Sequence, residues 1–129
     1  MPDHDVLELI KQADAAITAE DFEALMEFYA EDAILVVQPS QIARGKPQIR
    51  KAFEAIAAHF KNALRVEQGQ AQVLEGGDTA LVIMETLLFA ANASGPITRR
   101  ATYVFKRTEA GSWLCTVDNS YGTDLLNPS

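Results

Sequence analysis

The sequence predicts an α+β domain, with helices gathered near the N-terminus and a sheet formed mainly by the second half of the chain. Two observations lead to this prediction. Apolar residues up to about residue 60 mostly recur at steps of three and four, as on one face of a helix. After residue 63, segments of strand length follow one another with only short turns between them. Helices followed by an antiparallel meander are typical of the α+β class.

The first two helices are expected over residues 5–18 and 22–30. The apolar face of the first repeats at steps of four, three and four: Val6, Ile10, Ala13 and Ile17. Asp21 can accept hydrogen bonds from the free N–H groups of the first turn and so cap the second helix. The apolar face of that helix consists of Phe22, Leu25, Met26 and Tyr29. Each helix therefore has one face to bury.

A short strand and a third helix are expected next. The run at residues 32–37 is rich in β-branched side chains and stops at Gln38-Pro39, which predicts a strand. Residues 38–46 are expected to form a loop, in which Gly45 can adopt a positive φ. Pro47 suits the first position of a helix that continues to about residue 60.

Four longer strands complete the prediction: residues 64–75, 79–91, 97–107 and 112–121. Gly76-Gly77 supplies the positive φ angles that a tight hairpin demands. The segment 79–91 is apolar almost throughout, so we expect a central strand that is buried on both faces. The helices can cover only one face of the sheet. A second copy of the chain is expected to cover the other, which makes the protein a homodimer.

Charge is distributed unevenly along this acidic chain. The net charge is −7, but residues 1–32 alone carry −9, and residues 44–65 carry +5. Binding to phosphate backbones needs clustered lysine and arginine side chains, and no long basic stripe is present. We therefore expect no nucleic-acid partner.

Other classes are also made improbable by composition. The chain has no apolar run of membrane-spanning length, no basic n-region near its start and a single cysteine, Cys115. We expect a cytoplasmic protein with no membrane partner, formed by one domain over residues 1–129. The two histidines and the cysteine are scattered and no glycine-rich phosphate loop is present, so neither a metal site nor a cofactor is expected.

Four short motifs follow one another at a characteristic spacing: Asp21-Phe22, Tyr29–Ala33, Gly45–Arg50 and Gly111–Leu114. In these motifs the chain resembles, over about residues 5–121, the nuclear transport factor 2-like superfamily, which includes ketosteroid isomerases and SnoaL-like polyketide cyclases. The resemblance implies a cystatin-like cone, in which three N-terminal helices pack on a strongly curved mixed or antiparallel sheet. It also implies a mostly apolar pocket between helices and sheet, and a dimer across the outer sheet face.

The catalytic set of the ketosteroid isomerases is not retained. Those enzymes use an aspartate base, a tyrosine on the first helix and an acid on a later strand. By the resemblance, the base falls on Val37 or Gln38, the tyrosine on Ala13 and the strand acid near Tyr103. Neither Val37 nor Gln38 can take a proton from carbon. Tyr103 can still donate a hydrogen bond to a ligand oxygen, or it is a core aromatic residue with a satisfied hydroxyl.

Three elements offer further contacts for a ligand. Arg99 shares strand parity with Tyr103 and lies nearer the expected pocket mouth, where it can hold a carboxylate or enolate oxygen or form an ion pair at a sheet edge. His59 flanks the apolar stripe of the third helix. It can reach the pocket as an acid or base, or complement the helix dipole. Phe53 and Tyr29 are also expected ligand contacts.

Asp118 stands in a strand that continues an apolar sheet, and a buried carboxylate needs a partner. In a regular strand, Thr116, Asp118 and Ser120 share one face, and a bulge would invert the faces. Asp118 is then a general base with a raised pKa, with Thr116 and Ser120 as ligand contacts beside it, or it is the ion-pair partner of Arg99 or Arg100.

Two functions of different classes fit these features. One is a protein that binds a small apolar, cyclic or polyketide-like molecule in the cone, as an isomerase, cyclase or hydratase-type enzyme. The other is a non-catalytic homodimeric association module, a role that the resemblance also allows. A cone filled by Phe53, Phe89 and Trp113 would exclude the first function, and a monomer in solution would exclude the second.

Overall fold

The computed structural model describes residues 5–59, 64–90 and 97–126 of the chain. Its helices are α1 (Asp5–Ala19), α2 (Phe22–Met26), α3 (Gly45–His59) and a short 3₁₀ helix, η1 (Gly122–Leu126). Its strands are β1 (Tyr29–Gln38), β2 (Gln41–Arg44), β3 (Leu64–Gly76), β4 (Thr79–Ala90), β5 (Ile97–Arg107) and β6 (Trp113–Asn119). Among the described helices, none has the length and apolar character needed to cross a bilayer.

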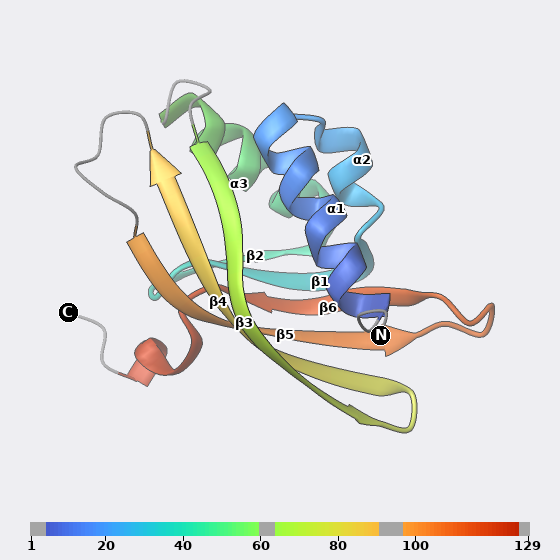
Figure 1. The fold of residues 1–129 in the computed structure, drawn as a ribbon. Coiled ribbons are helices and arrows are strands. Elements are labelled where there is room, and N and C mark those ends of the chain that lie inside the picture. The colour runs from blue at the N-terminus through green and yellow to red at the C-terminus, as the bar shows by residue number, and fades with distance from the viewer. Residues whose placement is uncertain (1–4, 60–63, 91–96, 127–129) are drawn as a thin grey trace.

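One curved sheet supports the three α-helices on its inner side (Figure 1). The six strands follow the order β2-β1-β6-β5-β4-β3. β1 and β6 are parallel, whereas the other neighbouring pairs are antiparallel. The predicted α+β class, with helices on a curved mixed sheet, is confirmed.

The second helix is shorter than predicted, and the strand after it is longer. α2 ends at Met26, and Tyr29 already belongs to β1. The backbone N–H of Cys115 donates to the carbonyl oxygen of Phe28 at 2.9 Å, and Tyr29 pairs with Cys115 across the parallel ladder. Sheet pairing with a distant strand therefore ends the helical pattern early, since such tertiary contacts outweigh local propensity.

The expected loop at residues 38–46 contains an additional strand, β2, which pairs with β1. The third helix also begins earlier than Pro47, at Gly45, whose φ is +82°. The Gln48 side chain accepts a hydrogen bond from the backbone N–H of Arg44 at 2.9 Å, which helps to fix this entry into α3.

The last strand ends at Asn119, two residues earlier than predicted. The side-chain oxygen of Asn119 accepts hydrogen bonds from the backbone N–H groups of Tyr121 and Gly122, at 3.0 and 3.1 Å. This local turn competes with the ladder. Gly122 has φ +54°, and a Cβ there would lie 2.1 Å from the carbonyl oxygen of Arg100, so the turn requires glycine.

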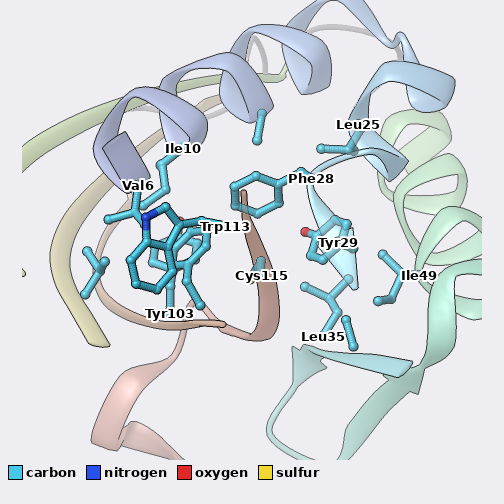
Figure 2. Close-up of a cluster of buried hydrophobic side chains, with 14 of the residues drawn as sticks. Val6, Ile10, Leu25, Phe28, Tyr29, Leu35, Ile49, Tyr103, Trp113 and Cys115 are labelled. Carbon is cyan, nitrogen blue, oxygen red and sulfur yellow. The ribbon is translucent and has the colours of Figure 1, made fainter. Parts of the chain in front are cut away.

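A closely packed part of the apolar core lies between the first half of α1 and the ends of the strands beneath it. Val6 and Ile10 point from α1 toward the sheet, near Trp113 (Figure 2). Phe28 packs edge to face on Phe105, with ring centroids 5.5 Å apart. This region is called the packed end below.

The outer face of the sheet is only partly covered in the single chain. Along β4, Val82, Met84 and Thr86 are buried, whereas Ile83 between them is 41 % exposed. The expected burial of this strand on both faces is therefore not met within one chain. The homodimer that would cover this face stays a prediction.

Candidate functional site

A cavity of about 260 Å³ lies between α1, α3 and the inner face of the sheet. Most of its wall is apolar and includes Ile17, Leu35, Val36, Phe53, Ile56 and Leu88. The polar part of the wall includes Asp14, Thr86, Arg99, Tyr103, Asp118 and Ser120. The cone is thus not filled by aromatic side chains, and a few polar groups converge on an apolar hollow. The part of the molecule around this cavity is called the hollow end below.

Asp118 reaches the cavity because β6 carries a bulge. Val104 pairs with Val117, but the next residue, Phe105, pairs with Cys115, so Thr116 is the additional residue. The bulge reverses the parity of the strand, and Cys115 and Asp118 both lie inward. The regular alternation expected from the sequence, with these two residues on opposite faces, is wrong.

Tyr29 is the hydrogen-bond partner of Asp118. Its hydroxyl donates to Oδ2 of Asp118 at 2.6 Å, within the range of short bonds to a charged acceptor. Among the described residues, no arginine forms the expected ion pair with Asp118. Burial raises the pKa of Asp118 to about 6, although the hydrogen bond from Tyr29 acts in the opposite direction.

A second carboxyl group, that of Asp14 on α1, lines the same cavity. Its Oδ2 accepts a hydrogen bond from Nε2 of Gln68 on β3. The Oε1 of the same amide accepts a bond from the Thr86 hydroxyl at 3.1 Å. Gln68 and Thr86 face each other across the β3–β4 ladder, so the amide is fixed between α1 and the sheet.

The two carboxyl groups influence each other. Burial raises the pKa of Asp14 to about 7, the Gln68 hydrogen bond lowers it, and the negative charge of Asp118 raises it further. Because Asp118 has the lower pKa, it ionises first, and its charge is present when Asp14 titrates. Near neutral pH one carboxyl group is therefore mostly ionised while the other keeps much of its proton.

Two tyrosines and an arginine complete the polar part of the wall. Burial raises the pKa of Tyr103 well above its usual value, and the charges of Asp118 and Asp14 add to this, so the phenol stays protonated. The Arg99 guanidinium lies over the Tyr121 ring, 4.2 Å from its centroid. The Tyr121 hydroxyl donates to the carbonyl oxygen of Val37 at 3.2 Å, which holds the ring beside β1.

The residues predicted from the sequence fall into three groups. One group lines the cavity: Phe53, Arg99, Tyr103, Asp118 and Ser120. Tyr29 is not in the wall but lies behind Asp118, with 1 % of its surface exposed. Thr116, in the bulge, is half-buried and not part of the wall. His59 is the last residue of α3, and its side chain lies outside the described part of the structure.

The positions matched to the isomerase catalytic set also separate. Val37 lies in the cavity wall, Gln38 is exposed beside the β1–β2 turn, and Ala13 is buried in the core. None of these side chains carries a proton-transfer group. Within the described ranges, no three histidine, cysteine, aspartate or glutamate side chains come together as metal ligands.

Asp14, Gln68 and Thr86, which form one hydrogen-bonded network at the site, were not singled out from the sequence. A signal for Asp14 was present, because it stands four residues after Ile10 and three before Ile17, on the apolar face of the first helix. An acid at such a position must be paired or functional. Gln68 and Thr86 gave no comparable signal, since their meeting depends on the β3–β4 register.

Three solved structures with similar folds are between 17 % and 26 % identical in sequence to this chain. Aln2 from a Streptomyces species is 17 % identical, with a TM-score of 0.80 over 98 % of this chain and 97 % of that one. An NTF2-like protein with a cystatin-like fold from Novosphingobium aromaticivorans is 26 % identical, with a TM-score of 0.72 over 86 % and 75 %. A proposed calcium/calmodulin-dependent protein kinase II association domain from Xanthomonas campestris is 20 % identical, with a TM-score of 0.73 over 88 % and 82 %.

The search of curated proteins found no match. A family model described as the SnoaL-like domain matches residues 6–115, most of the chain. The resemblance seen in the sequence motifs is thereby confirmed. The chain belongs to the SnoaL-like domain family, within the nuclear transport factor 2-like superfamily.

Proposed function

We propose that this protein binds a small, mostly apolar, ring-containing carbonyl compound in the cavity and catalyses proton transfer at one of its carbon atoms. Isomerases and cyclases of polyketide-like substrates carry out reactions of this class. The observation that carries the proposal is Asp118, a carboxyl group that faces an apolar hollow and has a pKa of about 6.

The size and lining of the cavity favour such a ligand. A volume of about 260 Å³ lies just below the usual range of ligand pockets, which begins at about 300 Å³, and therefore suits a small ligand. The wall buries apolar surface of the ligand, and the few polar groups fix its orientation. The family assignment to SnoaL-like domains supports the same substrate class.

Asp118 has the properties of a general base. Above pH 6 its carboxylate is mostly ionised, and the surrounding apolar wall leaves it more basic than an exposed aspartate. It can take a proton from a carbon atom next to a carbonyl group. Tyr29 holds the carboxylate in place, and Arg99 supplies a positive charge for a carboxylate group of the ligand near the Tyr121 ring.

Isomerisation of a monocyclic β,γ-enone tests this proposal, because the conjugated product absorbs in the ultraviolet. Replacing Asp118 with asparagine keeps the shape but removes the base, and we expect the rate to fall about 10²–10⁴-fold. Asp32→Asn is the matched control, since Asp32 is exposed on β1. An Asp118→Asn variant with the wild-type rate would overturn the proposal.

The second candidate function is a non-catalytic homodimeric association module. The favouring observation is a pair of apolar side chains on the outer face of the sheet, Leu74 and Ile83, which are 50 % and 41 % exposed. The fold is also shared with the proposed association domain from Xanthomonas campestris. Sedimentation at micromolar concentration tests this role: a dimer that Ile83→Glu dissociates supports it, and a wild-type monomer excludes it.

A further inference from the structure

We propose that Asp14 is the proton donor that acts together with Asp118, and that the substrate binds with its carbonyl oxygen toward α1 and its acidic C–H bond toward β6. This inference rests on the proposed function and specifies the orientation of the substrate. The cavity wall contains both carboxyl groups, one from the helical layer and one from the sheet. A ring-containing molecule between them contacts one group on each side.

The surroundings of Asp14 differ from those of a surface acid. Gln68 donates to its Oδ2, and Thr86 fixes the amide of Gln68 from the opposite end. In the described part of the chain, the hydrogen bond from Gln68 is the one that Asp14 receives. A carboxyl group held at one oxygen and facing a cavity can offer its proton to a ligand.

The charged and titratable groups around Asp14 favour opposite protonation states for the two carboxyl groups. Tyr103 on β5 is protonated, Asp118 on β6 ionises first, and Arg99 on β5 contributes a positive charge to the cavity wall. Between about pH 6 and pH 7, the main state has an ionised Asp118 and a protonated Asp14. A base and an acid are thus available together in one cavity.

The isomerisation needs no reactant other than the enone and the two carboxyl groups. The Asp118 carboxylate removes a proton from the carbon next to the carbonyl group, and the C–H electron pair forms a carbon–carbon double bond. The carbonyl oxygen takes the proton of Asp14, which gives a dienol from a β,γ-enone. Asp118 then returns its proton to the distal carbon, and the enol hydroxyl returns its proton to Asp14. The product is the conjugated enone, and both carboxyl groups regain their starting states.

The pH dependence of enone isomerisation tests the role of Asp14. For the wild type we expect kcat to rise through about pH 6, as Asp118 ionises, and to fall above about pH 7, as Asp14 loses its proton. Asp14→Asn should lower kcat at least tenfold and remove the alkaline limb. Asp32→Asn should change neither. Full activity in Asp14→Asn with the alkaline limb intact would overturn the assignment and leave the proposed function standing.

A second variant separates proton donation from a merely structural role. Gln68→Met removes the hydrogen bond that lowers the pKa of Asp14, so the alkaline limb should move to higher pH. Carboxyl ¹³C NMR should show the same shift for Asp14 without any turnover. An unmoved limb or an unmoved Asp14 titration would contradict the inference. If the wild type itself fails to isomerise the enone, the proposed function fails, and the assignment of Asp14 falls with it.

Discussion

The packed end and the hollow end of this molecule are built from the same secondary-structure elements. α1 buries Ile10 at the packed end and presents Asp14 to the cavity one turn later. β6 buries Cys115 in the core and turns Asp118 toward the cavity after its bulge. α1 and β6 therefore each contribute apolar side chains to the core along one part and a carboxyl group to the cavity along the next.

The difference between the two ends shows how the fold can accommodate two buried carboxyl groups, which lower its stability. A buried carboxyl group weakens a protein unless its surroundings hold it, and each of the two carboxyl groups has a hydrogen-bond partner: Gln68 for Asp14 and Tyr29 for Asp118. Tyr29, which holds Asp118, also packs edge to face on Phe28, with ring centroids 5.0 Å apart. The packed end thereby helps to hold Asp118 in the cavity wall.

The largest expected effect is the loss of a large side chain at the packed end. Phe105 is fully buried, and Phe105→Ala should lower the free energy of unfolding by about 3–5 kcal/mol. Phe53→Ala should cost less, because Phe53 already borders a cavity and loses fewer contacts. Urea denaturation of both variants measures the difference. Equal costs would remove the distinction between the two ends.

The next effect is a loss of stability with rising pH that originates at the hollow end. The pKa of Asp118 is about 6 in the folded state and near 3.8 in the unfolded chain, so the folded state binds more protons between these values. The free energy of unfolding therefore falls as pH rises from about 4 to 6, by about 3 kcal/mol from Asp118 alone. Asp14 extends the fall to about pH 7.

Denaturation of the wild type and of an Asp14→Asn/Asp118→Asn double variant at pH 4, 6 and 8 checks this slope. The double variant should gain stability over the wild type as pH rises, because it has no buried carboxyl group to ionise. Parallel curves for the two proteins would show that neither carboxyl group has a raised pKa.

A smaller effect is expected where the two ends meet. Tyr29→Phe removes the hydroxyl group that donates a hydrogen bond to Asp118, which should lower the free energy of unfolding by about 1–3 kcal/mol. The pKa of Asp118 should rise, since that hydrogen bond lowers it. Tyr121→Phe, which loses a bond to a backbone carbonyl group, is the control. NMR titration of Asp118 in both variants distinguishes them, and an unchanged pKa in Tyr29→Phe would contradict the link.

The smallest effect is expected for two arginines that each lie over an aromatic ring, one at the hollow end and one at the packed end. Arg99 lies over Tyr121, and Arg107 lies over Trp113 at 4.5 Å from the ring centroid. Replacing either with alanine should cost about 0.5–1 kcal/mol of stability. Only Arg99→Ala should weaken the binding of benzoate, an aromatic carboxylate, in a calorimetric titration. If Arg107→Ala weakened benzoate binding as much as Arg99→Ala, Arg99 would have no specific role in holding the ligand.

The sequence predicted the fold better than the site because the fold depends on local patterns. Apolar spacing located α1, and the paired glycines located the β3–β4 hairpin, since both signals act within a few residues. The early start of β1 at Tyr29 depends on pairing with the distant strand β6, which has no local signature. The strand β2 was missed although its hairpin with β1 is local, because the sequence predicted a loop there.

At the site, too, residues whose position follows from local patterns were predicted, and residues whose position depends on strand register were not. Tyr103, Arg99 and Phe53 could be placed because regular elements carry them toward the cavity. The faces of β6 could not be assigned, since the bulge at Thr116 is set by the β5–β6 register. Asp14 could be recognised as an acid on an apolar helix face. Its raised pKa and its role could not be predicted, because they depend on Gln68 and Asp118, which lie far away in the sequence.

The bulge in β6 determines which of two neighbouring residues, Val117 or Asp118, faces the cavity. In the bulged register Asp118 pairs with Tyr103 and faces inward. If Thr116 entered the ladder instead, the residues after it would each move one position along β5, so that Val117 would face the cavity and Asp118 would face outward. A strand slip of one residue, with no substitution, would therefore remove the carboxyl group of Asp118 from the cavity and leave that of Asp14 in place. The register of β6 thus decides whether the proposed base and the proposed proton donor face the same cavity.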